Sequence, residues 1–355
     1  RDGAAGTPER GGGSTRRPLQ PHSQHNPLTR RQCRIVMHLF RSLQAVSEAS
    51  GTGVVDWEQA GVAAKAGTDS GSLAVNEADR SGYAAEVRDA RDRLRAVTDI
   101  GFDLPETVEL QDRHHWIDAN RATFRRVVAP VEAAAAEAAG TATRVVNTGS
   151  MAFALGFLAR NVVGQYDPSL LADASDADHG LYFVHPNVVA VATELDVPYP
   201  RFRRWIAFHE VTHAAEFGAA PWLTGYLESR IERGVSKLTS GTVDRAALAE
   251  LQAAMTAVEG YAEVLMDRAF DDEYADLRQK LDARRGGGDP LSKLARRLLG
   301  LGLKRQQYER GAAFFDRIVD ERGLDAATVV WDRPETLPTD REIDDPGAWL
   351  TRIDP

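Results

Sequence analysis

Two histidines and a glutamate stand close together near the middle of the chain. His209 and His213 are four positions apart, and Glu210 follows the first histidine. Neither Gly nor Pro interrupts residues 203–217, so the pattern predicts a helix. One helical turn brings two imidazoles within about 6 Å of each other, close enough to bind one tetrahedral Zn²⁺. Glu210 lies on the shoulder of that face, where it could accept a proton from a metal-bound water.

This spacing is the H-E-x-x-H pattern of zinc metallopeptidases. The alternative interpretation is a solvated helix that happens to carry these residue types. The large apolar neighbours Trp205, Phe208 and Phe217 favour a buried zinc site. A structural zinc site would not need Glu210, so the sequence predicts a zinc-dependent hydrolase of peptide or amide bonds. Two alternatives stay open: a zinc-stabilised binding protein without catalysis, and a hydrolase of a non-peptide amide.

A catalytic zinc needs a third protein ligand besides the two histidines. The metzincin arrangement would place Gly at position 216 and His at position 219, and the residues present, Glu216 and Ala219, exclude it. A later apolar segment, 257–267, offers Glu259 and Glu263 one helical turn apart. Two carboxylates in such a segment need a charged partner, which zinc would supply. Glu216 and Glu263 compete with Glu259 for the role of ligand.

The catalytic reaction would also need a donor that stabilises the oxyanion. Tyr226, Tyr261 and His185 are the candidates, although Tyr and His are more often simply packed. Residues 181–184 read as a strand that ends before Pro186, and residues 164–168 read as a turn. If the strand has an exposed edge, an extended peptide substrate could pair with it, whereas an ordinary buried strand could not.

Composition limits the possible classes of protein. The 355 residues are 43% hydrophobic, which is enough for a large core. The sequence contains no apolar run of about 18 residues, so we expect no membrane-spanning helix. The net charge is −9, with +5 in residues 1–36 and therefore −14 in residues 37–355. Such an acidic body argues against nucleic-acid binding. Cys33 is the single cysteine, so no intrachain disulfide can form and we expect a reducing, cytoplasmic compartment.

The chain divides into an extension and one domain. Residues 1–36 lack hydrophobic periodicity and should be disordered. Patterned sequence begins at Met37, where we expect the native protein to start, and residues 37–355 read as a single, mostly α-helical domain with a few short strands. The sequence does not specify an oligomeric state. The predicted helices include residues 77–97, 114–128 (ending near Pro130), 244–270, 291–303 and 306–322, and a Pro- and Asp-rich tail, 332–355, should wrap the surface.

The helix around Glu259 resembles the third-ligand helix of glutamate-type zincins. There the first Glu binds metal, and an acid four residues later hydrogen-bonds a ligand histidine. The resemblance implies that Glu259 is the third ligand and that Glu263 fixes the tautomer of an imidazole. Glu216 would then be a surface residue or a hydrogen-bond acceptor for a ligand.

A wider resemblance covers nearly all of residues 37–355 and lies in the segments 163–167, 185–187, 205–217, 221–223, 259–260 and 331–349. The chain is similar to the zincin-like metallopeptidases of actinobacteria, chloroflexi and haloarchaea, and this similarity implies a zincin-like metalloprotease fold. Members are often labelled as associated with deazaflavin-coenzyme biosynthesis, because the two occur in the same genomes. Many members carry His where this chain has Tyr261.

Overall fold

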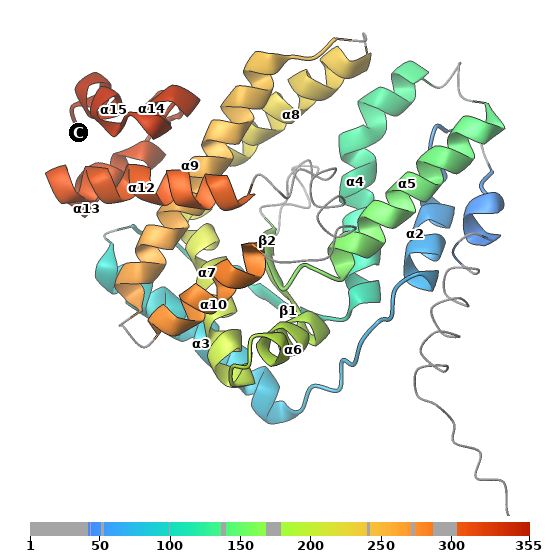
Figure 1. Cartoon of the computed structure of the whole chain (residues 1–355), viewed down its shortest axis with the longest axis horizontal. Coiled ribbons are helices and arrows are strands. Elements are labelled where there is room, and N and C mark those ends of the chain that lie inside the picture. Colours follow the sequence, from blue (N-terminus) through green and yellow to red (C-terminus); the bar gives the residue numbers. More distant parts are fainter. Residues whose placement is uncertain are drawn as a thin grey trace, which may run out of the picture. The chain divides into compact units, whose positions relative to one another are not determined.

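Helices make up most of the chain, and one small sheet lies among them, as the sequence predicts (Figure 1). All the residues described belong to one unit, His38–Pro355. The predicted disordered extension and the predicted helix 291–303 lie outside the described residues. Within the described part, no helix is both long and apolar enough to cross a membrane. The computed structural model describes residues 42, 44–50, 53–98, 100–135, 140–167, 179–239, 242–270, 274–286 and 304–355.

Along the chain, some of the longer helices come before the central strand of the sheet and the others come after it. Those that come before its central strand are α2 (Trp57–Ala66), α3 (Glu77–Val97), α4 (Arg113–Ala135) and α5 (Thr141–Ala159). Those that follow it are α6 (His185–Glu194), α7 (Tyr199–Ala219), α8 (Leu223–Thr239), α9 (Arg245–Ala269), α10 (Ala275–Gly286) and α12 (Lys304–Arg322). The chain then folds into the short helices α13 (Leu324–Thr328), η2 (Val329–Trp331), η3 (Pro334–Thr336), α14 (Asp340–Asp344) and α15 (Pro346–Ile353).

The sheet has three strands in the order β1-β3-β2. Its central strand pairs with β1 in parallel and with β2 in antiparallel. Leu181 and Phe183 point into the larger core, whereas Val184 belongs to a smaller core formed with α2, α4 and α5. This division follows from the alternation of side chains along a strand. The strands are β1 (Thr107–Gln111), β2 (Gly164–Asp167) and β3 (Gly180–Val184).

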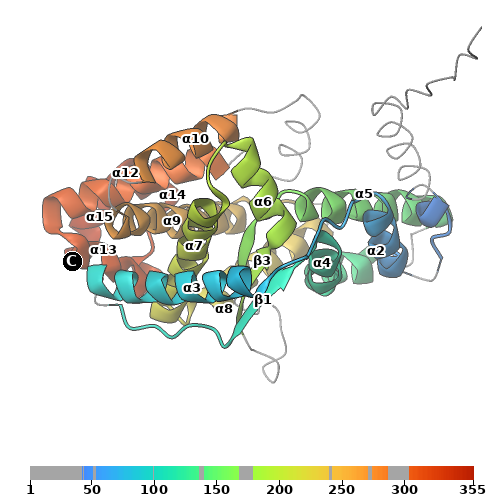
Figure 2. The same ribbon diagram turned by 90° about the horizontal axis from the view of Figure 1, so that it is seen from below.

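Helix α7 carries the H-E-x-x-H residues, has prolines at both ends and is anchored near its start. It begins after Pro198 with Pro200 in its first turn, and Pro221 follows its end. Near its start the buried Arg203 makes a bidentate ion pair with Glu86 of α3, at 2.8 and 2.9 Å. Figure 2 shows α3 passing across α7, and the two helices are in contact. The pair thus anchors the helix that presents the two histidines.

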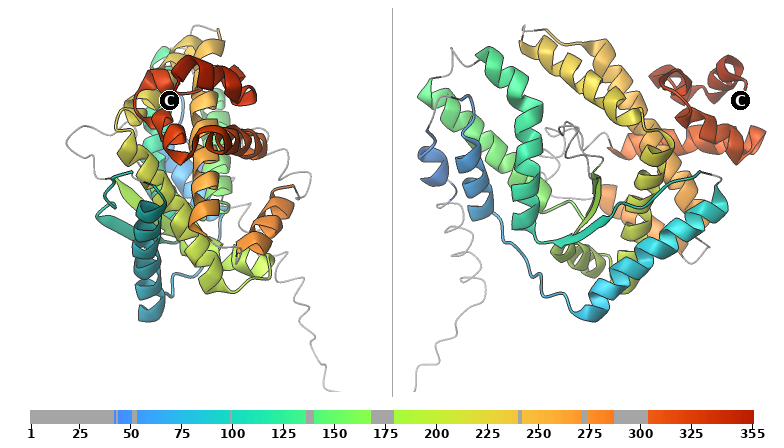
Figure 3. Two further views of the ribbon diagram at one scale, coloured as in Figure 1. Left: turned by 90° about the vertical axis from the view of Figure 1, so that its left-hand side faces the viewer. Right: turned by 180° about the vertical axis from the view of Figure 1, so that it is seen from behind.

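Helix α9 carries Glu259 and packs closely against α8 and α12. It begins at the N-cap Asp244, whose side chain accepts a hydrogen bond from the Ala247 amide. Figure 3 shows α8 and α9 side by side as an antiparallel pair. Gly260 of α9 meets Gly311 of α12, and a Cβ added at Gly260 would lie 2.3 Å from the Gly311 backbone. Two glycines are therefore needed where these helices cross.

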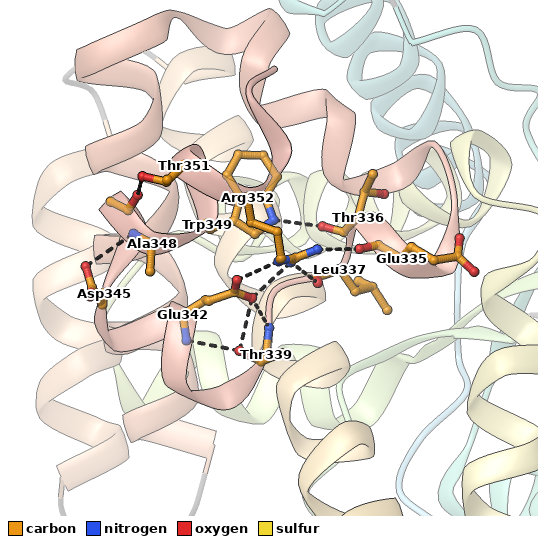
Figure 4. Close-up of polar contacts among 11 residues, drawn as sticks. Glu335, Thr336, Leu337, Thr339, Glu342, Asp345, Ala348, Trp349, Thr351 and Arg352 are labelled. Atoms are coloured by element: carbon orange, nitrogen blue, oxygen red, sulfur yellow. Dashed lines mark hydrogen bonds and ion pairs between the residues drawn. The ribbon is translucent and has the colours of Figure 1, made fainter.

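The C-terminal residues form a polar cluster over a buried aromatic ring (Figure 4). Arg352 binds both carboxylate oxygens of Glu342, at 2.6 and 2.9 Å, and also donates to the Leu337 carbonyl oxygen at 3.0 Å. Trp349 is fully buried, and its indole N–H donates to the Thr336 carbonyl oxygen at 2.8 Å. The prediction that residues 332–355 wrap the surface is wrong, because this segment contributes to the core.

Two other local predictions are wrong. Residues 164–167 form β2, not a turn, because they pair with β3. Helix α4 does not end near Pro130 but continues to Ala135. Proline removes one hydrogen bond from the helix ladder, and packing of α4 against α5 and α8 outweighs that loss.

The helix over residues 77–97 is confirmed.

Candidate metal site

Helices α7 and α9 bring three metal-ligating side chains together. One nitrogen each from His209 and His213 and one oxygen from Glu259 all lie within 4.8 Å of one another. The two imidazole rings are 4.6 Å apart between centroids, which is the consequence of their spacing of one helical turn. Nε2 of His213 lies 3.9 Å from a carboxylate oxygen of Glu259. These are the three residues that the sequence analysis assigns as ligands.

Each histidine is oriented by a neighbour on its own helix. The ring of His209 stacks on Trp205 at a centroid distance of 5.5 Å and an interplanar angle of 7°. Nδ1 of His213 lies 2.8 Å from Oε2 of Glu216, which is fully buried. A carboxylate on Nδ1 stabilises the proton there and leaves Nε2 to face Glu259. Glu216 is therefore a hydrogen-bond partner of His213, one of the three roles left open for it above.

The site concentrates negative charge around the second histidine. Burial alone would lower the pKa of His213, but the hydrogen bond and charge of Glu216, with the charges of Glu259 and Glu210, raise it to about 9. Burial raises the pKa of Glu216 to about 7, although its contact with His213 opposes this shift. Three buried carboxylates near two imidazoles therefore favour an added cation at this place.

The donor set fits zinc. Two imidazole nitrogens and one carboxylate oxygen are typical of catalytic zinc sites that leave a fourth position open. Two donors on one tetrahedral zinc are roughly 3.4 Å apart, so the 3.9 Å between Nε2 of His213 and Glu259 requires only a small closure. His209, His213 and Glu259 could hold the ion, and Glu216 would support the second histidine from behind.

Glu210 lies beside this set and is held by strand β2. Its side chain is buried, and Oε2 accepts a hydrogen bond of 2.8 Å from the backbone N–H of Tyr166. Its charge acts on His213, so the carboxylate is close to the ligands without belonging to the metal-binding set. This is the position that a residue carrying protons to and from the reacting groups would need.

The other predicted site residues have partners of different kinds. Glu263 forms an ion pair with Arg278 at 2.8 Å, and its role beside a ligand histidine stays a prediction. Tyr261 is buried against Phe315 and Trp331, with ring centroids 5.1 and 5.5 Å away. Tyr261 therefore contributes an aromatic ring to the core around α9.

The remaining two donor candidates pack against other side chains. The ring of Tyr226 lies under the guanidinium of Arg230, with a distance of 3.6 Å to the centroid. Nδ1 of His185 faces the hydroxyls of Tyr83 and Tyr199, each at 3.4 Å. Burial lowers the pKa of His185. As with Tyr261, an oxyanion role for either residue stays a prediction.

Sequence reasoning missed the strand that touches Glu210. Tyr166 also contacts Phe217 of α7, with ring centroids 5.4 Å apart, and its hydroxyl lies 3.1 Å from Nδ1 of His179. The hypothesis that strand 181–184 offers an edge to a peptide is wrong, because β3 is central and both its edges are paired. The edge strand beside α7 is β2, whose hydrophobic pattern is too short to signal a strand.

Comparisons with known proteins identify the family of this chain. The model of the zincin-like metallopeptidase family matches residues 55–243 and 233–350, which together span most of the chain. The chain belongs to the zincin-like metallopeptidase family. The predicted family is thereby confirmed, while its distribution among organisms and its link to a coenzyme stay predictions. Membership implies a metal, and the trio of His209, His213 and Glu259 is where this zincin-like protein could hold it.

One solved structure resembles this zincin-like chain over most of its length. It is titled "Crystal structure of a putative hydrolase with a novel fold from Chloroflexus aurantiacus". The two chains share 31% sequence identity with a TM-score of 0.66, and the match covers 89% of this chain and 98% of the other. No curated protein matches the chain. Family and neighbour together support a hydrolase.

Proposed function

We propose that the protein is a zinc-dependent hydrolase of peptide or amide bonds, with His209, His213 and Glu259 as zinc ligands. The observation that carries the proposal is the convergence of these three donors from α7 and α9, with the non-ligand carboxylate of Glu210 beside them. A site that only stabilised the fold would not need an additional acid that is not a ligand. Zinc, when bound, supplies a Lewis acid that polarises a carbonyl and acidifies water.

The residues of the chain have distinct tasks in this reaction. Glu210 takes a proton from the attacking water and returns it to the leaving amine, so its carboxylate must alternate between two protonation states. Glu216 keeps the proton of His213 on Nδ1, and Trp205 holds the plane of the His209 ring. The substrate is a peptide or another amide, and the acidic character of the domain does not favour nucleic acid.

Metal content and hydrolysis test the proposal separately. We expect the purified full chain to hold about one zinc per molecule, and the Glu259→Ala variant to lose it, by elemental analysis. Wild type should cleave members of a peptide library or of a panel of small amides. The Glu210→Gln variant should keep its zinc and lose roughly 10²- to 10⁴-fold in kcat.

Three outcomes would contradict parts of this proposal. Zinc retained in Glu259→Ala would remove Glu259 from the ligand set. Hydrolysis unchanged in Glu210→Gln would remove the proton-carrying role. A full complement of zinc, with strong thermal destabilisation on chelation and no turnover of peptides or amides, would instead indicate a zinc-stabilised binding protein.

A further inference from the structure

Strand β2 presents alternate backbone groups to β3 and to α7. The Val184 amide donates to the Val163 carbonyl oxygen at 3.0 Å, and Gln165 pairs with Tyr182 two positions further along. In an antiparallel ladder the residues between such pairs turn their N–H and C=O groups away from the partner strand. Gly164 and Tyr166 therefore direct their backbone groups outward, and the Tyr166 N–H meets Glu210 at 2.8 Å.

Gly164 leaves the space that the Glu210 side chain fills. A Cβ built on Gly164 would lie 2.4 Å from Oε1, 2.7 Å from Cγ and 2.8 Å from Cδ of Glu210. Contacts below 3.0 Å are not tolerated, so any side chain at position 164 must displace the glutamate. The displaced atoms belong to the flexible end of a side chain, and the backbone of β2 and α7 need not move.

We propose that the outer edge of β2 positions Glu210 for proton transfer. The Tyr166 N–H fixes one carboxylate oxygen, and the missing side chain of Gly164 makes room for the rest of the group. A backbone donor held by a strand ladder is rigid, which is what a group acting over a hydrogen-bond distance requires. The catalytic meaning rests on the proposed function, since the position matters for turnover only if Glu210 carries the proton.

The same contact limits how a substrate can bind. An extended peptide that joined the outer edge of β2 would need the outward backbone groups of that strand. At Tyr166 the N–H is already used by Glu210. Pairing of a peptide at this residue would therefore remove the glutamate from its anchor.

The amide of Tyr166 can be observed directly. The chain has eight tyrosines, so selective ¹⁵N-tyrosine labelling of the full protein gives few resonances, and Tyr166→Phe identifies the resonance by its loss. An N–H that donates to a carboxylate resonates downfield and exchanges slowly with solvent. We expect Glu210→Ala to move this resonance upfield and to speed its exchange about tenfold or more. Gly164→Ala should do the same while keeping zinc.

One variant serves as the control for this measurement. Gly101→Ala makes the same substitution outside helices and strands, where an added Cβ meets nothing within 4 Å, and should leave the Tyr166 resonance in place. If a hydrolysed substrate is in hand, Gly101→Ala should retain kcat, whereas Gly164→Ala should lower kcat with little change in KM.

Either of two results would overturn the inference. A Tyr166 amide that does not respond to Glu210→Ala would show that the hydrogen bond is absent, and this reading holds even if Gly164→Ala fails to fold. A resonance that responds to Glu210→Ala but not to Gly164→Ala would show that Gly164 does not determine the position of the glutamate. Neither result depends on zinc content or peptide cleavage, which test the proposed function.

Discussion

Glu216 shows how one side chain can decide the state of another. It lies three residues beyond His213 on α7, is fully buried, and accepts the Nδ1 proton of that histidine at 2.8 Å. A buried carboxylate without such a partner would be strongly disfavoured. The charge state of each of these two residues therefore depends on the other. Glu259 lies near the other ring nitrogen of His213, Nε2.

Removing the charge of Glu216 should weaken metal binding. We expect Glu216→Gln to raise the Kd for zinc by about 10- to 100-fold, because the neutral amide supports the imidazole less strongly than a carboxylate does. Competition with a chromophoric chelator measures this change. Glu250→Gln on α9 is the matched control: it also removes an acidic charge, and Glu250 pairs with Arg230 at 2.9 Å. Equal affinities in both variants would contradict the role of Glu216.

The sequence predicted some of these residues and left others open. His209, Glu210 and His213 follow from helical spacing, which is a local property. Glu216 lies on the same face of α7 as the histidines, and its spacing from His213 allows either metal ligation or a hydrogen bond to that histidine. Only the side-chain rotamer of Glu216 decides between these two roles, and the sequence does not specify it. Tyr166 acts through its backbone N–H, so its residue type carries no signal at all.

At the scale of elements, the crossing of α9 and α12 supports the helix that carries Glu259. Gly260 and Gly311 meet at this crossing, and Glu259 directly precedes Gly260. A Cβ added at Gly311 would lie 2.3 Å from the Thr256 carbonyl oxygen, a backbone atom that cannot turn away. The two helix axes can thus approach this closely only because Gly260 and Gly311 have no side chains.

Gly311→Ala should therefore destabilise the fold. We expect a loss of roughly 1–3 kcal/mol in the free energy of unfolding, because the two helices must separate. Urea denaturation followed by circular dichroism measures it. The control is Gly225→Ala in α8, where an added Cβ meets nothing within 4 Å and the change should be neutral or stabilising by up to about 1 kcal/mol. Equal stability of the two variants would refute the close crossing.

Elements with strong local periodicity were predictable, and those that depend on distant partners were not. The helix over residues 77–97 has a regular apolar stripe and begins at the N-cap Asn76. Strand β2 has the sequence Gly-Gln-Tyr-Asp, which has low strand propensity and resembles a turn. It becomes a strand because it pairs with β3, which lies more than ten residues further along the chain.

At the scale of the whole molecule, the C-terminal cluster joins the last helices to the large core. Burial raises the pKa of Glu342, but the hydrogen bonds from Arg352 and Thr339 outweigh it and leave the pKa below the ordinary value of 4.5. The contribution of Glu342 to stability is therefore fully present above about pH 4.5 and is lost as the pH falls through its folded-state pKa.

Glu342→Gln should remove this contribution. At about pH 7 we expect the variant to be less stable than wild type by roughly 1–3 kcal/mol, since it loses hydrogen bonds to a charged group. The difference should shrink as the pH falls below 4.5 and through the lowered pKa of Glu342, because wild type then loses the same interaction. Denaturant titrations at several pH values measure both effects. A difference that is constant with pH would show that ionisation of Glu342 does not contribute.

The composition of this segment concealed its role. Residues 332–355 are rich in Pro and Asp, which is typical of loops. Here Thr339 and Asp345 are N-caps of short helices, and Trp349 and Leu350 are buried. Which core these apolar side chains join depends on α12 and on the arrangement of the whole chain, and no local pattern contains that information.

Trp331 affects when, during synthesis, the core beside the candidate metal site can form. Its ring packs on Tyr261, two positions after Glu259, and its carbonyl oxygen accepts a hydrogen bond of 2.9 Å from the indole of Trp222. During synthesis, α7 and α9 leave the ribosome before Trp331 does. A nascent chain that ends before Trp331 thus contains both histidines and Glu259 while the core around Tyr261 is incomplete. The site should therefore become rigid only after Trp331 has emerged, and a ribosome-bound fragment lacking Trp331 should not be a competent hydrolase.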